Sequence, residues 1–291
     1  MSMHSRLSSL LDAGAFAFGP DGIYSAPMPS SASEQDAERS LRERVAARQQ
    51  DNYLAAIAQS HSIPVMDHTV GRFLRNMPQG ALILDIGGCW GWHWRGLAAT
   101  RPDLGVLIID FVRANLIHAQ RLLWPLVGTQ VALMHANATG LPFPDAGASP
   151  PGFDGVWSVK VFQHIPDFAR ACREAYRVLR SGGRFANYSL HTTPLNRAIY
   201  WLLSKRFHTD GMVGNDFHLT RANDLQRRIV ADIFVGGVVD RYTECLFHPD
   251  LKLTFTGRLG SPLGQLDARL GCMPQLGRWI ARQRSFEAAK I

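Results

Sequence analysis

Short apolar segments alternate with helical ones between residues 80 and 190, and this alternation constrains the fold more than any other feature. Strands that are apolar on both faces and alternate with helices are typical of a parallel sheet that helices cover on both sides. The sequence therefore predicts a doubly wound α/β domain. The predicted strands are residues 81–87, 105–110, 130–137, 153–159 and 184–190, and the predicted helices are residues 92–102, 113–128 and 168–183.

Two later segments, residues 238–247 and 284–290, are also predicted as strands, which gives a seven-stranded sheet. The residues between the fifth and sixth strands, about 191–235, predict a helical insertion that could serve as a lid. Residues 248–284 contain Gly and Pro and predict a long connection.

The first part of the chain has a different pattern. Residues 31–59 are predicted to form one helix with Ser33 as its N-cap, since acids come early and arginines late. We therefore predict an N-terminal extension with helices over residues 1–79, followed by the α/β domain over residues 80–291.

Composition sets broad limits on function. The 291 residues carry a net charge of +7, but Lys and Arg are spread along the chain, which favours an ordinary basic enzyme over a nucleic-acid binder. None of the four cysteines stands at C-x-x-C spacing, so we expect no metal site. An Asp interrupts the N-terminal apolar residues, and no segment has the roughly 20 apolar residues of a membrane span. We expect a cytoplasmic protein.

Ligands of open α/β sheets bind outside the carboxyl ends of the strands, so the residues after each strand carry the functional signal. The first strand leads into Asp85 and a G-G-x-x-G loop, whose acid would repel a diphosphate. Asp110 ends the second strand and can accept hydrogen bonds from two ribose hydroxyls. Asn137 follows the third strand and can both accept from an adenine amino group and donate to a ring nitrogen. This order disfavours a dinucleotide and favours a smaller nucleoside ligand.

Bulky side chains crowd the same glycine loop. Trp90 or Trp92 could cover a cationic ligand, because a tryptophan face attracts a cation. Trp94 is predicted to pack the first helix onto the sheet, and His93 is predicted to pack nearby.

The sequence resembles the class I S-adenosylmethionine-dependent methyltransferases of the small-molecule type. The resemblance covers residues 80–190, with weaker support over 238–290, and rests on LILDIGGCWG, VLIIDFVRANLIHAQ, ANATGLPFPD, FDGVWSVKVFQHIPD and REAYRVLRSGGRF. It implies a Rossmann-like fold and S-adenosylmethionine as cofactor. The residues that it implies for cofactor binding are Tyr53, Asp85, Gly87, Gly88, Cys89, Trp90, Gly91, Asp110, Phe111, Val112, Asn137, Ala138, Ser158 and Lys160.

The chain departs from the family pattern at two of these positions, Cys89 and Asn137. The family usually has glycine where Cys89 stands, and often Asp where Asn137 stands. A lysine at position 160 would be unfavourable beside a sulfonium unless its ammonium points away.

Methyl transfer to oxygen or carbon also requires loss of a proton, and histidine is the natural base near neutral pH. His164 and His191 follow the fourth and fifth strands and are the candidates. We predict transfer to a small-molecule or lipid-like acceptor. The alternatives are an RNA or protein methyltransferase, although no Pro-Pro motif follows the fourth strand, and a catalytically inactive binding protein.

The segment PLNRAIYWLLSKRF, residues 194–207, is amphipathic. It could be a lid, or it could contact a membrane surface near a lipid-like substrate. We favour a helix packed on the sheet. The sequence leaves open whether the protein is a monomer or a homodimer.

Overall fold

The computed structural model describes most of the chain. The described residues are 3–14, 16–28, 33–47, 52–59, 61–147, 152–191, 193–204, 210–213, 216–219, 222–247 and 260–291.

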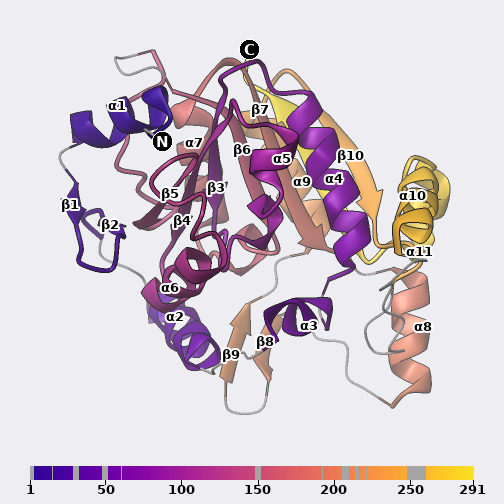
Figure 1. Cartoon of the computed structure of the whole chain (residues 1–291). Helices are drawn as coiled ribbons and strands as arrows, with labels where there is room; N and C mark the ends of the chain where they lie inside the picture. The colour runs from indigo at the N-terminus through magenta and orange to yellow at the C-terminus, as the bar shows by residue number, and fades with distance from the viewer. Residues whose placement is uncertain are drawn as a thin grey trace.

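One mixed sheet of nine strands forms the centre of the molecule, in the order β1-β2-β5-β4-β3-β6-β7-β11-β10 (Figure 1). The strands from β2 to β7 in this order pair in parallel, whereas β11 is antiparallel to both of its neighbours. Seven of these strands overlap the predicted segments, but the sheet also contains the short strands β1 and β2 and so differs from the predicted seven-stranded sheet. The bounds are β1 Ala17–Phe18, β2 Tyr24–Ser25, β3 Leu82–Ile86, β4 Gly105–Asp110, β5 Val131–His135, β6 Phe153–Val159, β7 Leu179–Leu190, β10 Val238–Thr243 and β11 Gln283–Ala289.

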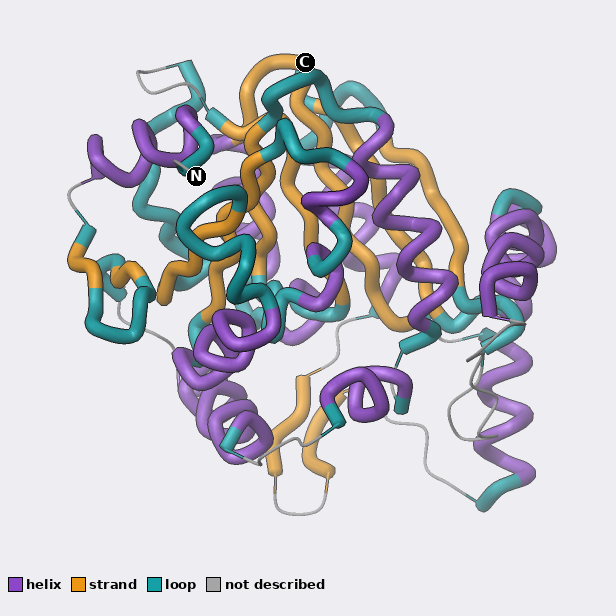
Figure 2. Tube along the Cα trace, in the orientation of Figure 1, coloured by secondary structure: helices purple, strands orange, loops and turns teal. Residues whose placement is uncertain are grey.

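Helices cover both faces of the sheet and bury a separate apolar core on each (Figure 2). Alternate residues of a strand point to opposite faces, so Leu84 joins the core under α7 and Ile83 joins the core under α4. One face carries α1 Ser5–Gly14, α7 Phe168–Val178 and α9 Asn223–Ile233. The other carries α4 Ile63–Arg75, α5 Leu97–Thr100 and α6 Arg113–Leu122. This three-layer arrangement confirms the predicted α/β class.

The predicted helix over residues 31–59 is two helices. The first, α2 Ser33–Ala46, ends well before α3 Tyr53–Ala58 begins. Asn52 starts the second helix, because its side-chain oxygen accepts a hydrogen bond from the Ala55 amide at 3.1 Å. The cap predicted at Ser33 concerns a side chain outside the described set.

Three other segments differ from prediction. Residues 92–102 form only a 3₁₀ turn, η1 Trp92–Trp94, followed by the short α5. Helix α7 ends at Val178, before the predicted end at residue 183, and the chain continues directly into β7. The long connection after β10 contains two helices, α10 Gly260–Gly271 and α11 Pro274–Ile280.

The insertion after β7 is only partly helical. It contains α8 Pro194–Leu202, then the hairpin β8 Asp210–Val213 and β9 Asp216–Leu219, and then α9. Strand β9 of the hairpin contacts α2, and the hairpin lies beyond the carboxyl ends of the central strands (Figure 1).

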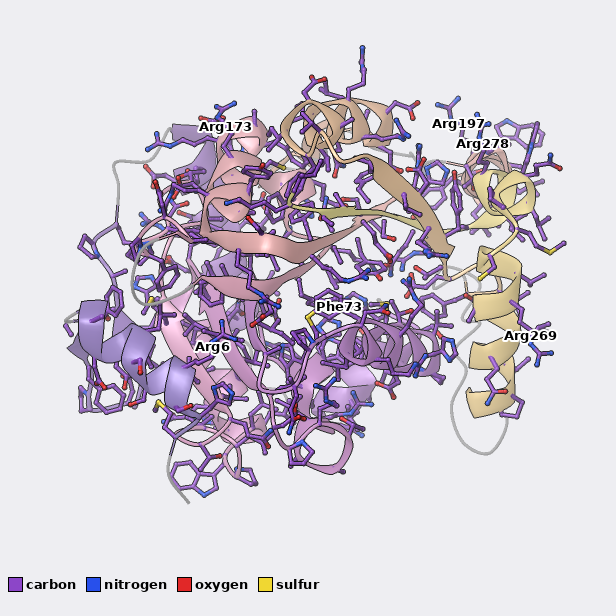
Figure 3. All side chains as sticks on the ribbon, turned by 90° about the horizontal axis from the view of Figure 1, so that it is seen from above. Arg6, Phe73, Arg173, Arg197, Arg269 and Arg278 are labelled. Carbon is purple, nitrogen blue, oxygen red and sulfur yellow. The ribbon has the colours of Figure 1, made fainter. Side chains whose placement is uncertain are left out.

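Helix α8 packs against α11 and not on the sheet, contrary to our preferred interpretation. Ile199 is buried, but Trp201 keeps 78% of its surface exposed. Arg197 of α8 and Arg278 of α11 lie close together at this corner (Figure 3). Within the described residues, every helix is too short or too polar to cross a membrane.

Candidate active site

A cavity of about 610 Å³ opens at the carboxyl ends of β3, β4, β5 and β6. Helices α2 and α3 contribute the opposite wall, through residues such as Arg42 and Ile57. Cavities of this size typically hold small ligands and cofactors. The position agrees with the rule that ligands of open α/β sheets bind outside the carboxyl ends of the strands.

The loop after β3 folds tightly over the end of β4. The Gly87 amide donates to the Ile109 carbonyl at 2.8 Å, and Gly87 has a positive φ of 69°. Cys89 also has a positive φ, 51°, which explains why glycine suits this position better in the family. Gly87, Gly88 and Cys89 all line the cavity.

Asp85 holds this loop from below. Its carboxylate is buried and accepts a hydrogen bond from the Trp94 indole N–H at 2.7 Å. Trp94 is fully buried, as predicted. Gly88 is required beside this pair, because a Cβ there would collide with the Asp85 carboxylate and with Ile108. Burial raises the pKa of Asp85 to about 7.

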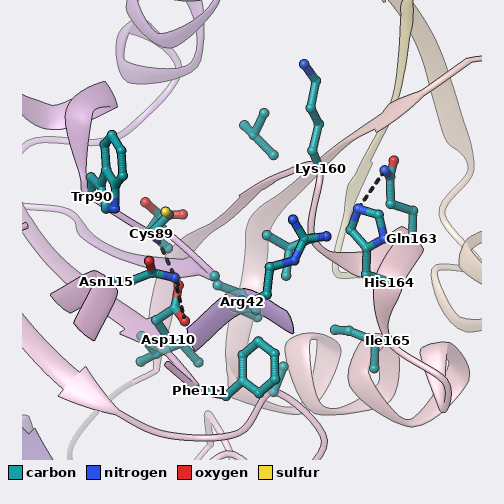
Figure 4. Close-up of a pocket in the computed structure, with 18 of the residues that line it drawn as sticks. Arg42, Cys89, Trp90, Asp110, Phe111, Asn115, Lys160, Gln163, His164 and Ile165 are labelled. Atoms are coloured by element: carbon teal, nitrogen blue, oxygen red, sulfur yellow. Dashed lines mark hydrogen bonds between the residues drawn. The ribbon is translucent and has the colours of Figure 1, made fainter. Parts of the chain in front are cut away.

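Asp110 links the ends of β3 and β4 and faces the cavity (Figure 4). Its Oδ2 accepts from the Cys89 amide at 3.1 Å, and its Oδ1 accepts from the Val112 amide at 2.8 Å. The Asn115 side-chain amide also donates to both oxygens, at 3.4 Å each, so a ligand hydroxyl would have to share or displace these long contacts. Burial raises the pKa of Asp110 to about 6.

Raised carboxyl pKa values make the folded state more stable at acid pH. Between the ordinary value of 3.8 and about 7, the folded protein binds a proton at Asp85 that the unfolded chain does not. The free energy of unfolding should therefore fall as pH rises through this window. We expect Asp85→Asn to flatten the slope by up to about 1.4 kcal/mol per pH unit. Urea unfolding at several pH values measures this slope for both proteins. An equal slope in Asp85→Asn would contradict a raised pKa at Asp85.

The end of β5 supplies a second group of lining residues, Asn137 and Ala138. The Asn137 side-chain oxygen already accepts from Gln35 Nε2, from the Thr139 amide and from the Thr139 hydroxyl, each at 3.0 Å. Its amide N–H groups are therefore the atoms best placed to meet a ligand, whereas the predicted acceptor role would require Gln35 of α2 to move. Phe111 lines the same end of the cavity.

Trp90 also lines the cavity, with its ring 5.3 Å from the Tyr53 ring and 5.2 Å from the His118 ring. Tyr53 itself lies behind Trp90 and is not part of the cavity wall. Trp90 thus contacts both the core side chains and the space where a ligand would bind.

Five of the residues proposed from sequence lie outside the cavity lining: Tyr53, Gly91, Val112, Ser158 and His191. Val112 is fully buried at the start of α6. The Ser158 hydroxyl donates to the Ile86 carbonyl at 2.9 Å and ties β6 to β3. Gly91, with a φ of 67°, starts the turn at Trp92. These residues shape the site from behind.

The two candidate bases have different surroundings. His164 lines the cavity, with Nε2 3.0 Å from Gln163 Nε2 and Nδ1 4.0 Å from Glu38 (Figure 4). His191 Nδ1 lies 2.6 Å from the Asn223 side-chain oxygen, and its ring packs against Tyr242. His164 is the better placed of the two.

Lys160 comes directly after β6, and its ammonium points away from Asp110 and Phe111 (Figure 4). It lies 3.8 Å from Glu244, which also accepts from Arg282 at 2.9 Å. A lysine beside a sulfonium is unfavourable unless its ammonium points away. Here the ammonium is directed away from the Asp110 end of the cavity.

Several lining residues were not identified from sequence. They come from parts of the chain outside the five-strand pattern: Gln35, Glu38 and Arg42 of α2, His61 before α4, and Arg282 before β11. Within the described residues, no three His, Cys, Asp or Glu side chains gather as they would around a metal ion.

Comparison with known proteins agrees with this architecture. Residues 84–187 match a family model described as a methyltransferase domain. The chain is 43% identical over 108 residues to the 27-O-demethylrifamycin SV methyltransferase of Amycolatopsis mediterranei (strain S699), which is 37% of this chain and 38% of that protein. It is 31% identical over 125 residues to the ubiquinone/menaquinone biosynthesis C-methyltransferase UbiE of Hahella chejuensis, covering 42% and 48% respectively. The chain thus spans less than half the length of these relatives.

Solved structures show the same fold at low identity. A methyltransferase in complex with the Trm112 activator of Haloferax volcanii aligns with a TM-score of 0.53 and 18% identity, covering 90% of this chain and 98% of that one. Phosphoethanolamine N-methyltransferase 2 of Haemonchus contortus, solved with S-adenosylhomocysteine, aligns with a TM-score of 0.50 and 16% identity, covering 77% and 52%. The cavity in this chain has the ligand chemistry that such a cofactor requires, with a buried carboxylate, a glycine loop and an apolar ring. Residues 84–187 therefore contain a methyltransferase domain of the class I, S-adenosylmethionine-dependent type, and the cofactor of that class is S-adenosylmethionine.

Proposed function

We propose that the whole chain transfers a methyl group from S-adenosylmethionine to an oxygen or carbon atom of a small-molecule acceptor. One observation carries this proposal: a single cavity has Asp110 and the glycine loop at one end, and Lys160 and Arg282 at the other. Two ligands can therefore meet inside it. The names of the relatives refer to small-molecule acceptors, which supports the same class here.

The residues at the Asp110 end suit the cofactor. Asp110 would accept the two ribose hydroxyls, Phe111 and Ala138 would border the adenine, and Asn137 would donate to a ring nitrogen. The loop from Gly87 would let the backbone approach the methionine part. The cofactor supplies an already activated methyl group, so the contribution of these residues is positioning and exclusion of water.

Proton removal from the acceptor is assigned to His164. It lines the cavity, whereas His191 is held by Asn223 outside the lining. The contact between His164 and Glu38 of α2 would orient the ring and favour its protonated form once it has taken a proton.

Calorimetric titration with S-adenosylhomocysteine tests the cofactor assignment, and we expect micromolar binding. Incubation with S-adenosylmethionine and a panel of hydroxylated small molecules then tests transfer, with a one-methylene gain in acceptor mass as the readout. No heat of binding at millimolar S-adenosylhomocysteine would exclude the proposed function. Cofactor binding without turnover of any acceptor in the panel would instead favour the catalytically inactive alternative.

A further inference from the structure

The end of the cavity away from Asp110 contains an unusual ionic cluster. Lys160 and Arg282 both line the cavity, and both contact the same carboxylate, Glu244, at 3.8 and 2.9 Å. The Glu244 side chain is fully buried and also accepts from the Ser62 amide at 2.8 Å. Two cationic side chains therefore share one acid, and the cationic groups are the ones that face the cavity.

The backbone at this cluster is strained. Lys160 has a φ of 58° and Glu244 has a φ of 57°, in the left-handed region that side chains other than glycine rarely adopt. Backbone hydrogen bonds hold both residues there, from the Lys160 amide to the Tyr188 carbonyl at 2.7 Å and from the Arg282 amide to the Glu244 carbonyl at 3.1 Å. Such strain is concentrated at functional sites, because the surrounding structure must maintain it.

Two histidines complete this end of the cavity. His93 is 91% buried, and neither of its ring nitrogens has a hydrogen-bond partner. His61 has an unpartnered, buried Nδ1. Both rings line the cavity beside Trp92, at centroid distances of 4.2 and 5.5 Å. Buried polar atoms normally find partners, so these nitrogens are available to a ligand.

Burial keeps both histidines neutral. It lowers the pKa of His93 to about 3, and it lowers the pKa of His61 well below its ordinary value. A neutral imidazole has one N–H donor and one acceptor nitrogen. Burial also lowers the pKa of Lys160 to about 7, so an anion placed beside it would restore its charge.

We propose that this end of the cavity, formed by Lys160, Arg282, His61, His93 and Trp92, binds an aromatic acceptor through a hydroxyl group that it holds as the oxyanion. The proposal rests on the proposed function and names its acceptor class. Lys160 and Arg282 supply positive charge to the oxygen, and the histidines supply N–H donors. The aromatic ring of the acceptor packs against the contacting pair of rings that Trp92 and His93 form. His164, the base assigned above, takes the hydroxyl proton and passes it to solvent.

The probe for this site is 4-nitrophenol, whose anion absorbs visible light and whose neutral form does not. We expect the protein, with and without saturating S-adenosylhomocysteine, to bind the probe and produce the anion band at pH values where the free probe is neutral. Lys160→Met should lose this band and weaken anion binding by roughly tenfold or more, because it removes a charged donor. Lys160→Arg should keep the band.

Two further variants make the result decisive. Lys290→Met removes a lysine on the far side of the sheet, beside Tyr176, and should bind the probe like the unmodified protein. His93→Phe keeps an aromatic ring but removes the donor, and should weaken anion binding by about two- to tenfold even if Lys160→Met does not fold.

The failures are distinguishable. S-adenosylhomocysteine binding without any anion band would overturn this inference and leave the proposed function standing. An anion band that Lys160→Met and His93→Phe both retain would equally overturn it. Absence of S-adenosylhomocysteine binding, with the band intact and sensitive to Lys160, would contradict the proposed function alone.

Discussion

Asp110→Ala is expected to weaken S-adenosylhomocysteine binding by roughly 10- to 150-fold. Hydrogen bonds to a charged group contribute about 1.5–3 kcal/mol, and this carboxylate is the only acid of the cavity placed at the end of β4, where ribose hydroxyls bind in this fold. The same change also frees the amides of Cys89 and Val112, so part of the loss would come from the loop itself. Calorimetric titration measures the effect.

Asp110→Asn separates the two contributions. An amide oxygen can still accept from one backbone N–H, so the loop should be largely preserved while ribose binding is impaired. Asp145→Ala serves as the remote control, since Asp145 is exposed and forms a surface ion pair with Arg177 at 3.2 Å. The assignment would be wrong if Asp110→Asn bound S-adenosylhomocysteine as tightly as Asp145→Ala does.

Gly87→Ala is expected to reduce the free energy of unfolding by about 1–3 kcal/mol and to abolish measurable cofactor binding. Alanine at a φ of 69° is strained, and its Cβ would lie 2.5 Å from the Val161 side chain, which lines the cavity. Relief requires the loop or Val161 to shift, and either shift moves atoms of the cavity wall. Urea unfolding and S-adenosylhomocysteine titration measure the two effects.

Cys89→Gly is the matched variant two residues away. Glycine adopts the φ of 51° without strain, and the amide that donates to Asp110 remains. We expect cofactor affinity to stay within about threefold of that of the unmodified protein. Equal losses from Gly87→Ala and Cys89→Gly would show that any change to the loop is harmful, and that the positive φ values carry no special role.

The clustering of Asp85, the glycine loop and Asp110 at one end of the cavity was predictable because its signals are local. Asp85 and Asp110 each end an apolar run, and the ends of adjacent parallel strands meet at one edge of a sheet. The glycines follow directly in the chain. No long-range information was needed to place Asp110 beside the amide of Cys89.

The other end depends on strand direction. Glu244 follows β10, and Arg282 precedes the antiparallel β11. Both residues therefore lie at the end of the sheet where the parallel strands have their carboxyl ends. Applying the strand-end rule to the last two strands would have found them, but only once β11 was known to be antiparallel. His61 had no such signal, because its place depends on how α4 packs.

The α2 residues at the cavity could not be predicted either. The sequence suggested one long helix packed on a larger body, but α2 ends at Ala46 and α3 begins at Tyr53. The two helices therefore line the cavity as separate elements, with Arg42 on α2 and Ile57 on α3. Helical periodicity identifies the helical residues and does not show where one helix ends and the next begins.

The pairing of β2 with β5 has a consequence for how the molecule avoids self-association. Tyr24 and Ser25 lie opposite Met134 and His135, and the Ala26 amide donates to the His135 carbonyl at 3.1 Å. A chain that began at the predicted domain boundary, residue 80, would lack β2. The apolar strand β5 would then lie at the edge of the sheet with unpaired amides and carbonyls. Exposed edges of that kind recruit strands from other molecules. Within the N-terminal segment, β2 therefore protects β5 from pairing with other molecules, while α2 and α3 line the cavity.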